Sequence, residues 1–161
     1  MTLQQYNSYF ESLADAHIEL GAGGHFMRGE VEEFFQRFRS DVRFPCLVLE
    51  GSEVAYHRTD LPLSTRERTG AFIIADTYGQ RQDYDDMQQS LQRCERIAEE
   101  MIGRMERDMQ EGTSPICSLR AVAMVYLQNQ TAKYVGARVE FTAVGPACLW
   151  KDNPWTDLPT G

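Results

Sequence analysis

The sequence lacks the short motifs that mark many catalytic and metal sites. No serine lies in a GxSxG pattern, and neither HExxH nor a DxDxDG loop occurs. In the sequence, His17, His25 and His57 are too far from one another, and from any cysteine, for the usual spacing of metal ligands. We therefore expect a protein that is not an enzyme and has no catalytic residue, metal or cofactor.

Cysteines are few, and long apolar runs are absent. Cys46, Cys94, Cys117 and Cys148 contain no CxxC or CxxxC pair, so neither a zinc knuckle nor a redox motif is predicted. Isolated thiols of this kind are typical of small buried side chains. No apolar run approaches the roughly 18 residues of a membrane-spanning helix, and the N-terminal sequence does not resemble a signal peptide. These absences predict a cytoplasmic protein without a membrane partner.

Positive charge is in short supply. Lys and Arg number 16 against 24 Asp and Glu, which gives a formal net charge of −8. Binding to a phosphate backbone depends on Lys and Arg that displace counterions, and an anionic membrane attracts the same residues. The composition therefore favours protein partners, and we expect no specific nucleic-acid binding.

The strongest pattern in the chain is an amphipathic helix over residues 83–111. Its apolar residues recur at spacings of three and four, which keeps them on one face. The acidic residues Asp83, Asp85 and Asp86 mark its start, where the helix dipole is positive, and Gly112 is a natural stop. A helix about 40 Å long, at 1.5 Å per residue, needs a long surface to cover. The apolar stripe consists of Tyr84, Met87, Leu91, Cys94, Ala98, Met101 and Met105.

The flanking segments predict two further helices and about five strands. The helices are expected over 2–20, where Thr2 and Gln5 suggest a capping box, and over 28–39. The strands are expected in five places, namely 42–50, a return strand around Val54 and Tyr56 after a Gly51-Ser52 turn, 70–78, 116–127 and 134–144. The polar segment 59–69 is predicted to be a projecting loop.

The apolar content of each strand predicts its place in the sheet. Segment 70–78 is almost continuously apolar, which is typical of a central strand. Segment 116–127 is apolar on both alternating sets, so both of its faces are expected to be covered. Segment 134–144 alternates cleanly, with one apolar set facing the core. We predict an α+β fold, in which one long helix packs across a mainly antiparallel sheet of about five strands, with two N-terminal helices.

The predicted domain spans residues 1–148, and residues 149–161 form an extended tail. The tail contains Trp150 and Trp155 among prolines and aspartates, a composition that suits neither a helix nor a central strand. Exposed tryptophans often anchor protein contacts. The tail either folds back on its own domain or contacts a partner.

Three stretches resemble small structural proteins of phage tail modules. They are GAFIIADTYG at 70–79, DYDDMQQSLQRCERIAEEMIGRM at 83–105 and KYVGARVEFTAVGPACLW at 133–150. In outline they are similar to the tail terminator group, with its related tail-completion and neck proteins. The resemblance implies a small α+β subunit that forms a ring, usually a hexamer, on the tail tube. It also implies contacts with tail tube and neck proteins and a place in the virion tail.

The sequence is compatible with two functions. The first is a phage or prophage tail assembly protein, with Arg66, Glu67 and Arg68 at the rim of the contact between copies and the two tryptophans as further interface candidates. The second is a small soluble enzyme or ligand-binding domain with a pocket between the N-terminal helices and the sheet. Its candidate residues are Tyr56, His57 and the acids near Asp83.

Overall fold

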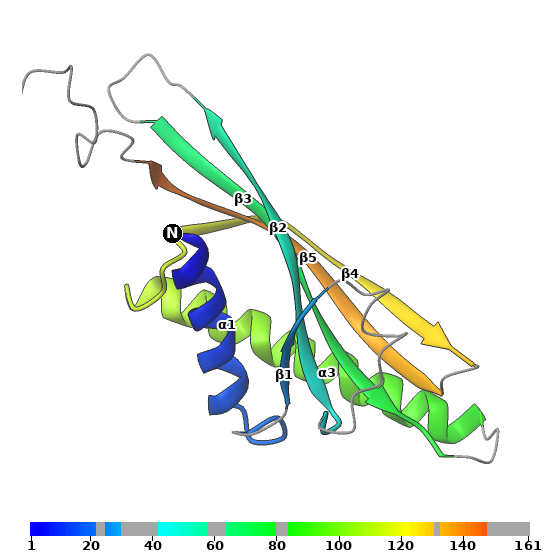
Figure 1. Ribbon diagram of the computed structural model, residues 1–161. Helices are drawn as coiled ribbons and strands as arrows, with labels where there is room; N and C mark the ends of the chain where they lie inside the picture. The colour runs from blue at the N-terminus through cyan, green and yellow to red at the C-terminus, as the bar shows by residue number, and fades with distance from the viewer. Residues whose placement is uncertain (22–24, 30–41, 58–63, 80–83, 131–132, 148–161) are drawn as a thin grey trace, which may run out of the picture.

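The computed structural model describes residues 1–21, 25–29, 42–57, 64–79, 84–130 and 133–147. In these ranges the chain forms two helices and one five-stranded sheet (Figure 1). The chain is α+β, as the sequence predicts. In chain order the elements are α1 (Leu3–Ala16), β1 (Phe26–Arg28), β2 (Cys46–His57), β3 (Ser64–Thr77), α3 (Tyr84–Gln110), β4 (Ser118–Asn129) and β5 (Tyr134–Ala147).

The strands lie in the order β1-β2-β3-β5-β4. Neighbouring strands from β2 to β4 pair antiparallel, whereas β1 pairs parallel with the start of β2. The sheet is therefore mixed. β3 occupies the middle, and Phe72, Ile73 and Ile74 in it are fully buried. The prediction that segment 70–78 is central is confirmed.

The prediction of three helices is wrong, because the described residues contain two. Arg28, the predicted start of the second helix, lies in β1 instead. The backbone there hydrogen-bonds to the sheet rather than to itself, and the Gly29 N–H donates to the Leu49 carbonyl at 3.1 Å. Residues 30–39 of the predicted helix lie outside the described residues.

Gly51 and Ser52 do not form the predicted turn. β2 continues through them, and its register with β3 shifts between Leu49 and Ser52. Such a β-bulge places an extra residue in one strand and bends it, so that pairing continues without a reversal of the chain. The expected first hairpin is therefore a single strand, and the predicted return strand is its second half.

The predicted loop 59–69 is also partly wrong. Residues 64–69 begin β3, where they pair with β2 on one side and with β5 on the other, while residues 58–63 lie outside the described residues. We call this end of the sheet the arm, which consists of Ser52–His57, Ser64–Gly70 and Phe141–Ala147. Its outer part extends beyond the helices (Figure 1). Polar side chains are tolerated there because solvent reaches the strand faces.

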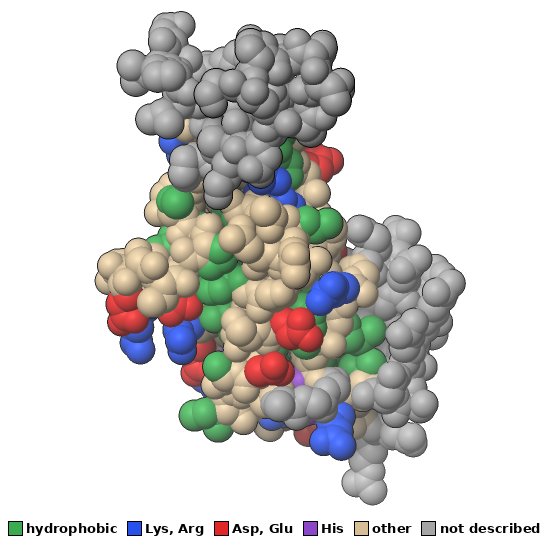
Figure 2. All heavy atoms as spheres, turned by 60° about the vertical axis from the view of Figure 1, so that its left-hand side comes forward, with side chains coloured by type: hydrophobic (Ala, Val, Ile, Leu, Met, Phe, Trp, Pro, Cys, Tyr) green, Lys and Arg blue, Asp and Glu red, His purple; other side chains and the backbone are tan. Residues whose placement is uncertain are grey.

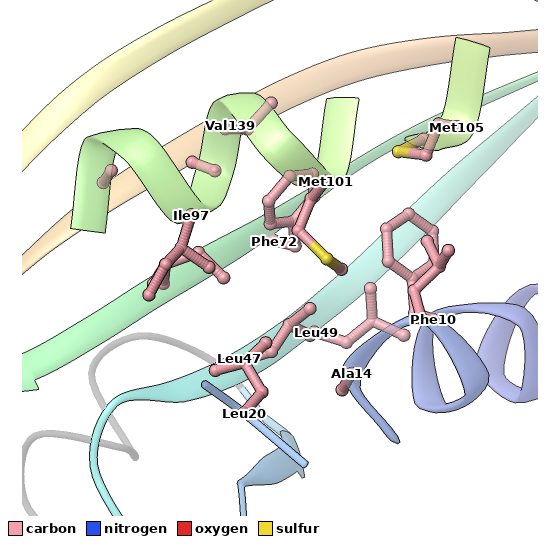
Figure 3. Packing of buried hydrophobic residues seen from close by; sticks show 14 of the residues in the cluster. Phe10, Ala14, Leu20, Leu47, Leu49, Phe72, Ile97, Met101, Met105 and Val139 are labelled. Carbon is pink, nitrogen blue, oxygen red and sulfur yellow. The ribbon is translucent and has the colours of Figure 1, made fainter. Parts of the chain in front are cut away.

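Both helices cover the same face of the sheet (Figure 1). The α3 stripe largely matches the prediction, since Cys94, Ala98, Met101 and Met105 are buried. Ile97, which the predicted stripe omits, is also fully buried, whereas Tyr84 is 68% exposed at the helix start. Figure 3 shows Ile97, Met101 and Met105 directed from α3 toward residues of the sheet and α1.

The ends of the two helices follow their local sequence. Thr2 and Gln5 form the predicted capping box, with the Gln5 N–H donating to Thr2 Oγ1 at 3.1 Å. α1 ends at Ala16, before the predicted limit of residue 20. α3 ends at Gln110, and Gly112 adopts the left-handed conformation with φ of 70°. The predicted helix stop is confirmed.

Aromatic rings join α1 to the sheet. The Phe10 ring centroid lies 5.6 Å from that of Phe72 in β3 and 5.5 Å from that of Phe141 in β5. α1 is also bound to α3, because the Tyr9 hydroxyl donates to Asp108 Oδ2 at 3.1 Å. Fixed in this way, α1 lies across the base of the arm.

The alternation in β5 is confirmed, because its predicted core-facing set from Val135 to Ala143 is buried. The opposite face of the sheet holds a smaller buried cluster around Val48 and Ile73. β4 contradicts its prediction, because most of its side chains are exposed. It is one of the two outer strands of the sheet, and α3 packs mainly across β3 and β5.

Gly70 lets the Tyr6 hydroxyl rest against β3. A Cβ at this position would overlap that hydroxyl, which is buried without a hydrogen-bond partner. We expect Gly70→Ala to lower the free energy of unfolding by about 1–3 kcal/mol, measured by urea denaturation. Tyr6→Phe removes the hydroxyl, so the double variant should regain most of the loss. Additive effects in this double-mutant cycle would show that the two groups do not collide.

Candidate functional site

The candidate interface residues Arg66, Glu67 and Arg68 lie in β3, at the base of the arm, and not in a loop. Successive side chains of a strand point to opposite faces, so this strand divides them. Arg66 and Arg68 lie on the face that carries the helices, and Glu67 lies on the other. The structure therefore separates the three charges into two environments.

Arg68 is the more deeply buried of the two arginines, at 4% exposed. Its Nη1 donates to Ser52 Oγ, and its guanidinium lies over the Tyr6 ring, 5.2 Å from the ring centroid. Its Nε is buried without a hydrogen-bond partner. Burial lowers the pKa of the Arg68 guanidinium, and the positive charge of Arg66 lowers it further. In the described residues no carboxylate forms an ion pair with it.

Arg66 lies beside Arg68, two residues earlier on the same face. Its guanidinium stacks over the Tyr56 ring, with 5.6 Å to the centroid, and its Nε is also buried without a partner. A small cavity of about 10 Å³ adjoins both arginines, with Ile116 and Ala143 in its wall. This volume holds about one water molecule.

Glu67 is satisfied on the opposite face. Its carboxylate lies 3.2 Å from His57 Nε2 and accepts a hydrogen bond from Arg120 Nη1 at 3.1 Å. His57 lies in β2, Glu67 in β3 and Arg120 in β4, so these contacts join three strands. The contact between Glu67 and Arg120 crosses β5, which lies between β3 and β4. Because the groups are partly exposed, the pairs contribute little to stability.

The outer strand β4 presents apolar side chains to solvent. Val122 is 42% exposed, Val125 50% and Tyr126 51%. In the described residues no strand pairs with the outer edge of β4. An edge strand with free backbone donors and acceptors is a template for pairing with another chain. The sequence reasoning missed this surface, because an apolar strand on both faces also fits the centre of a sheet.

A buried ion pair lies on the face of the sheet opposite the helices. Arg138 in β5 contacts the Glu50 carboxylate, with 2.7 Å between Nη2 and Oε2, and also pairs with Glu140. Glu50 is 7% exposed. The hydrogen bond to Glu50 raises the pKa of Arg138, which keeps its guanidinium charged. This network is a structural connection between β2 and β5, across β3.

An open groove of about 350 Å³ lies between α1 and the start of the arm. Tyr6, Asn7, Arg28 and Glu50 line it. Its charged groups are already engaged, since Glu50 pairs with Arg138 and Arg28 pairs with Glu11 at 3.3 Å. The groove offers polar surface but no free pair of acid and base.

The residues proposed for an enzyme do not converge. Tyr56 and His57 are successive residues of β2 and point to opposite faces, with Tyr56 against Arg66 and His57 against Glu67. Neither lines the groove, and Asp83 lies outside the described residues. Tyr56 and His57 are therefore adjacent in the sequence, but their side chains do not share a site.

Metal ligands do not cluster in the described ranges, where no three His, Cys, Asp or Glu side chains are arranged to hold an ion. Burial raises the pKa of the Cys46 thiol and raises that of Cys94 to about 12, so both remain protonated and unreactive. Cys117 is exposed. Cys148, together with the tail 149–161 and its candidate residues Trp150 and Trp155, lies outside the described residues.

Comparison of the sequence with models of known protein families finds no matching family, and comparison with curated proteins finds no match. The resemblance to phage tail proteins therefore stays a prediction. Among the described residues, no helix has both the length and the apolar character needed to cross a membrane.

Arg138→Met would leave the Glu50 carboxylate buried without its main counter-charge. We expect this variant to lose about 3 kcal/mol of unfolding free energy in urea denaturation, because an unpaired buried charge is strongly destabilising. Adding Glu50→Gln should recover much of the loss. Arg107→Met, which changes an exposed arginine of α3, is the matched control and should shift stability by less than about 0.5 kcal/mol. Equal losses in both arginine variants would contradict a special role for the pair.

Proposed function

We propose that this chain is a structural, non-enzymatic assembly protein of a phage or prophage tail. In this proposal it forms a ring, of tail terminator or tail-completion type, that caps the tail tube and docks to a neck protein. It would be cytoplasmic during assembly and part of the virion tail afterwards. The observation that carries the proposal is the exposed apolar edge of β4, supported by the resemblance of the sequence.

The sheet offers two different edges for contact between copies. One is β4 along its whole length. The other is the second half of β2, from Glu53 to His57, where the described residues contain no further paired strand and Tyr56 is 50% exposed. A contact between two unlike surfaces is heterologous, and repeated around a closed rotation it gives a ring. Two unlike edges are therefore suited to ring assembly.

Pairing of these edges would bury both backbone and side chains. Strand addition satisfies the outward N–H and C=O groups, and each half-exposed Val or Tyr of β4 contributes about 1 kcal/mol as its remaining surface is covered. The contact would be modest for a single pair of copies. A closed ring, or a tail tube that presents several sites at once, would strengthen it through effective concentration.

The charge of the molecule is compatible with this role. Figure 2 shows acidic and basic side chains interspersed on the visible face, with hydrophobic side chains in small separate groups. The net charge of −8 would repel DNA from a ring lumen, so that DNA passes without binding. The proposed mechanism is complementarity of shape and strand edges, and no bond is made or broken.

The function is tested by measuring mass against concentration. We expect size-exclusion chromatography with light scattering to show a concentration-dependent ring, and electron microscopy to show the protein at the ends of assembled tail tubes. A compact monomer at every concentration, together with no binding to tail tubes in electron microscopy, would contradict the proposal.

Val125→Lys should block the contact between copies without unfolding the subunit. A lysine on an edge strand disfavours edge-to-edge pairing, and Val125 is half-exposed, so the core is unaffected. We expect at least a tenfold weaker association in light scattering and an unchanged circular dichroism spectrum. Ile18→Lys is the matched control, because Ile18 is 98% exposed and lies after α1, away from either edge. Equal loss of association in both variants would exclude the β4 edge as the interface.

A further inference from the structure

Arg68 and its neighbour Arg66 differ from the other partly buried arginines that the structure describes. Arg138 pairs with Glu50 and Arg93 with Asp76. Arg68 is more buried than these, yet the described residues provide it with no carboxylate. Its polar contacts are one serine hydroxyl and the face of one tyrosine ring.

Hydrogen bonding leaves one buried edge of the Arg68 guanidinium without a partner. Nη1 is occupied by Ser52, whereas Nε has no partner. Nε and Nη2 form the edge of a guanidinium that binds a carboxylate through two parallel hydrogen bonds. The small cavity next to Arg66 and Arg68 is bounded on the other sides by Met1, Pro115, Ile116, Ala143, Val144 and Gly145. Burial, and then the charges of Arg66 and Arg68, lower the pKa of the Met1 amino group, so a third basic group lies at this cavity.

A buried charge without a counter-charge is unfavourable, and a second cation beside it makes it more so. Arg66 is that second cation, and its own Nε is also without a partner. The tyrosine rings under the two guanidiniums offset only part of the cost, because a cation–π contact is weaker than a charge-assisted hydrogen bond. An anion at this point would satisfy both arginines together.

We propose that Arg68, with Arg66 beside it, is a binding site for one carboxylate group. The small cavity holds about one water molecule, which is the size of one carboxylate oxygen. It can therefore take an oxygen of a carboxylate whose carbon chain stays outside, and it cannot take a nucleotide. The carboxylate comes either from an Asp or Glu of a second copy, since the chain is rich in both, or from a free small carboxylate. The site lies on the arm and not on the β4 edge, so it does not rest on the proposed ring.

The first measurement is thermal unfolding of the full chain in sodium acetate against sodium chloride at equal ionic strength. If a free carboxylate binds, acetate raises the midpoint of the wild-type protein, and Arg68→Met removes that shift. Arg68→Met should also be at least as stable as wild type without acetate, because the unpaired buried charge is gone. Arg107→Met is the control, with the same change at an exposed site, and should keep the wild-type response.

The second measurement is the mass of the assembly by light scattering. If the carboxylate belongs to a second copy, Arg68→Met weakens association at least tenfold while the subunit stays folded. Val125→Lys separates the two proposals, because it should weaken strand pairing and leave the acetate shift intact.

The site is excluded if acetate does not change the thermal unfolding midpoint of the wild-type protein and Arg68→Met assembles as the wild-type protein does. It is also excluded if Arg68→Met is simply less stable and keeps the acetate shift, since Arg68 would then serve packing alone. If Arg68→Met does not fold, Arg66→Met tests the same cavity from a less buried position, with loss of either response expected and retention of both excluding the site.

Discussion

The packing of Phe10 against Phe72 and Phe141 is the contact on which the rest of this structure depends. It joins α1 to the two central strands, and the three rings lie within 6.3 Å of one another between centroids. With α1 fixed there, Tyr6 reaches β3 at Gly70 and covers Arg68. The same helix binds α3 through Tyr9 and Asp108. One aromatic cluster thus sets both the core and the base of the arm.

This arrangement divides the sheet into a covered part and a bare part. Two helices on one face cover the middle of β3 and β5, where apolar side chains are fully buried. They do not extend over the outer arm or fully over β4 (Figure 1). Strand edges and arm faces therefore remain for contacts with other molecules.

The long helix, the last strand, the capping box and the Gly112 stop could all be predicted from sequence. Each depends on residues a few positions apart, whose periodicity or backbone preference survives in any fold. The α+β class and the central place of segment 70–78 followed from the same patterns. The three interface candidates in β3 were also named from sequence, but for a projecting loop that does not exist at those residues.

Pairing between segments that are distant in the sequence determined the features that local patterns did not predict. Gly51 and Ser52 have the composition of a turn, yet they form a bulge because β3 pairs with β2 on both sides of them. Arg66 and Arg68 became neighbours on one face only because that segment joins the sheet. The apolar pattern of β4 fits a covered strand as well as an edge strand, and only the strand order makes it outermost. Local sequence determines what a segment can form, whereas long-range pairing and helix packing determine which of its side chains meet solvent.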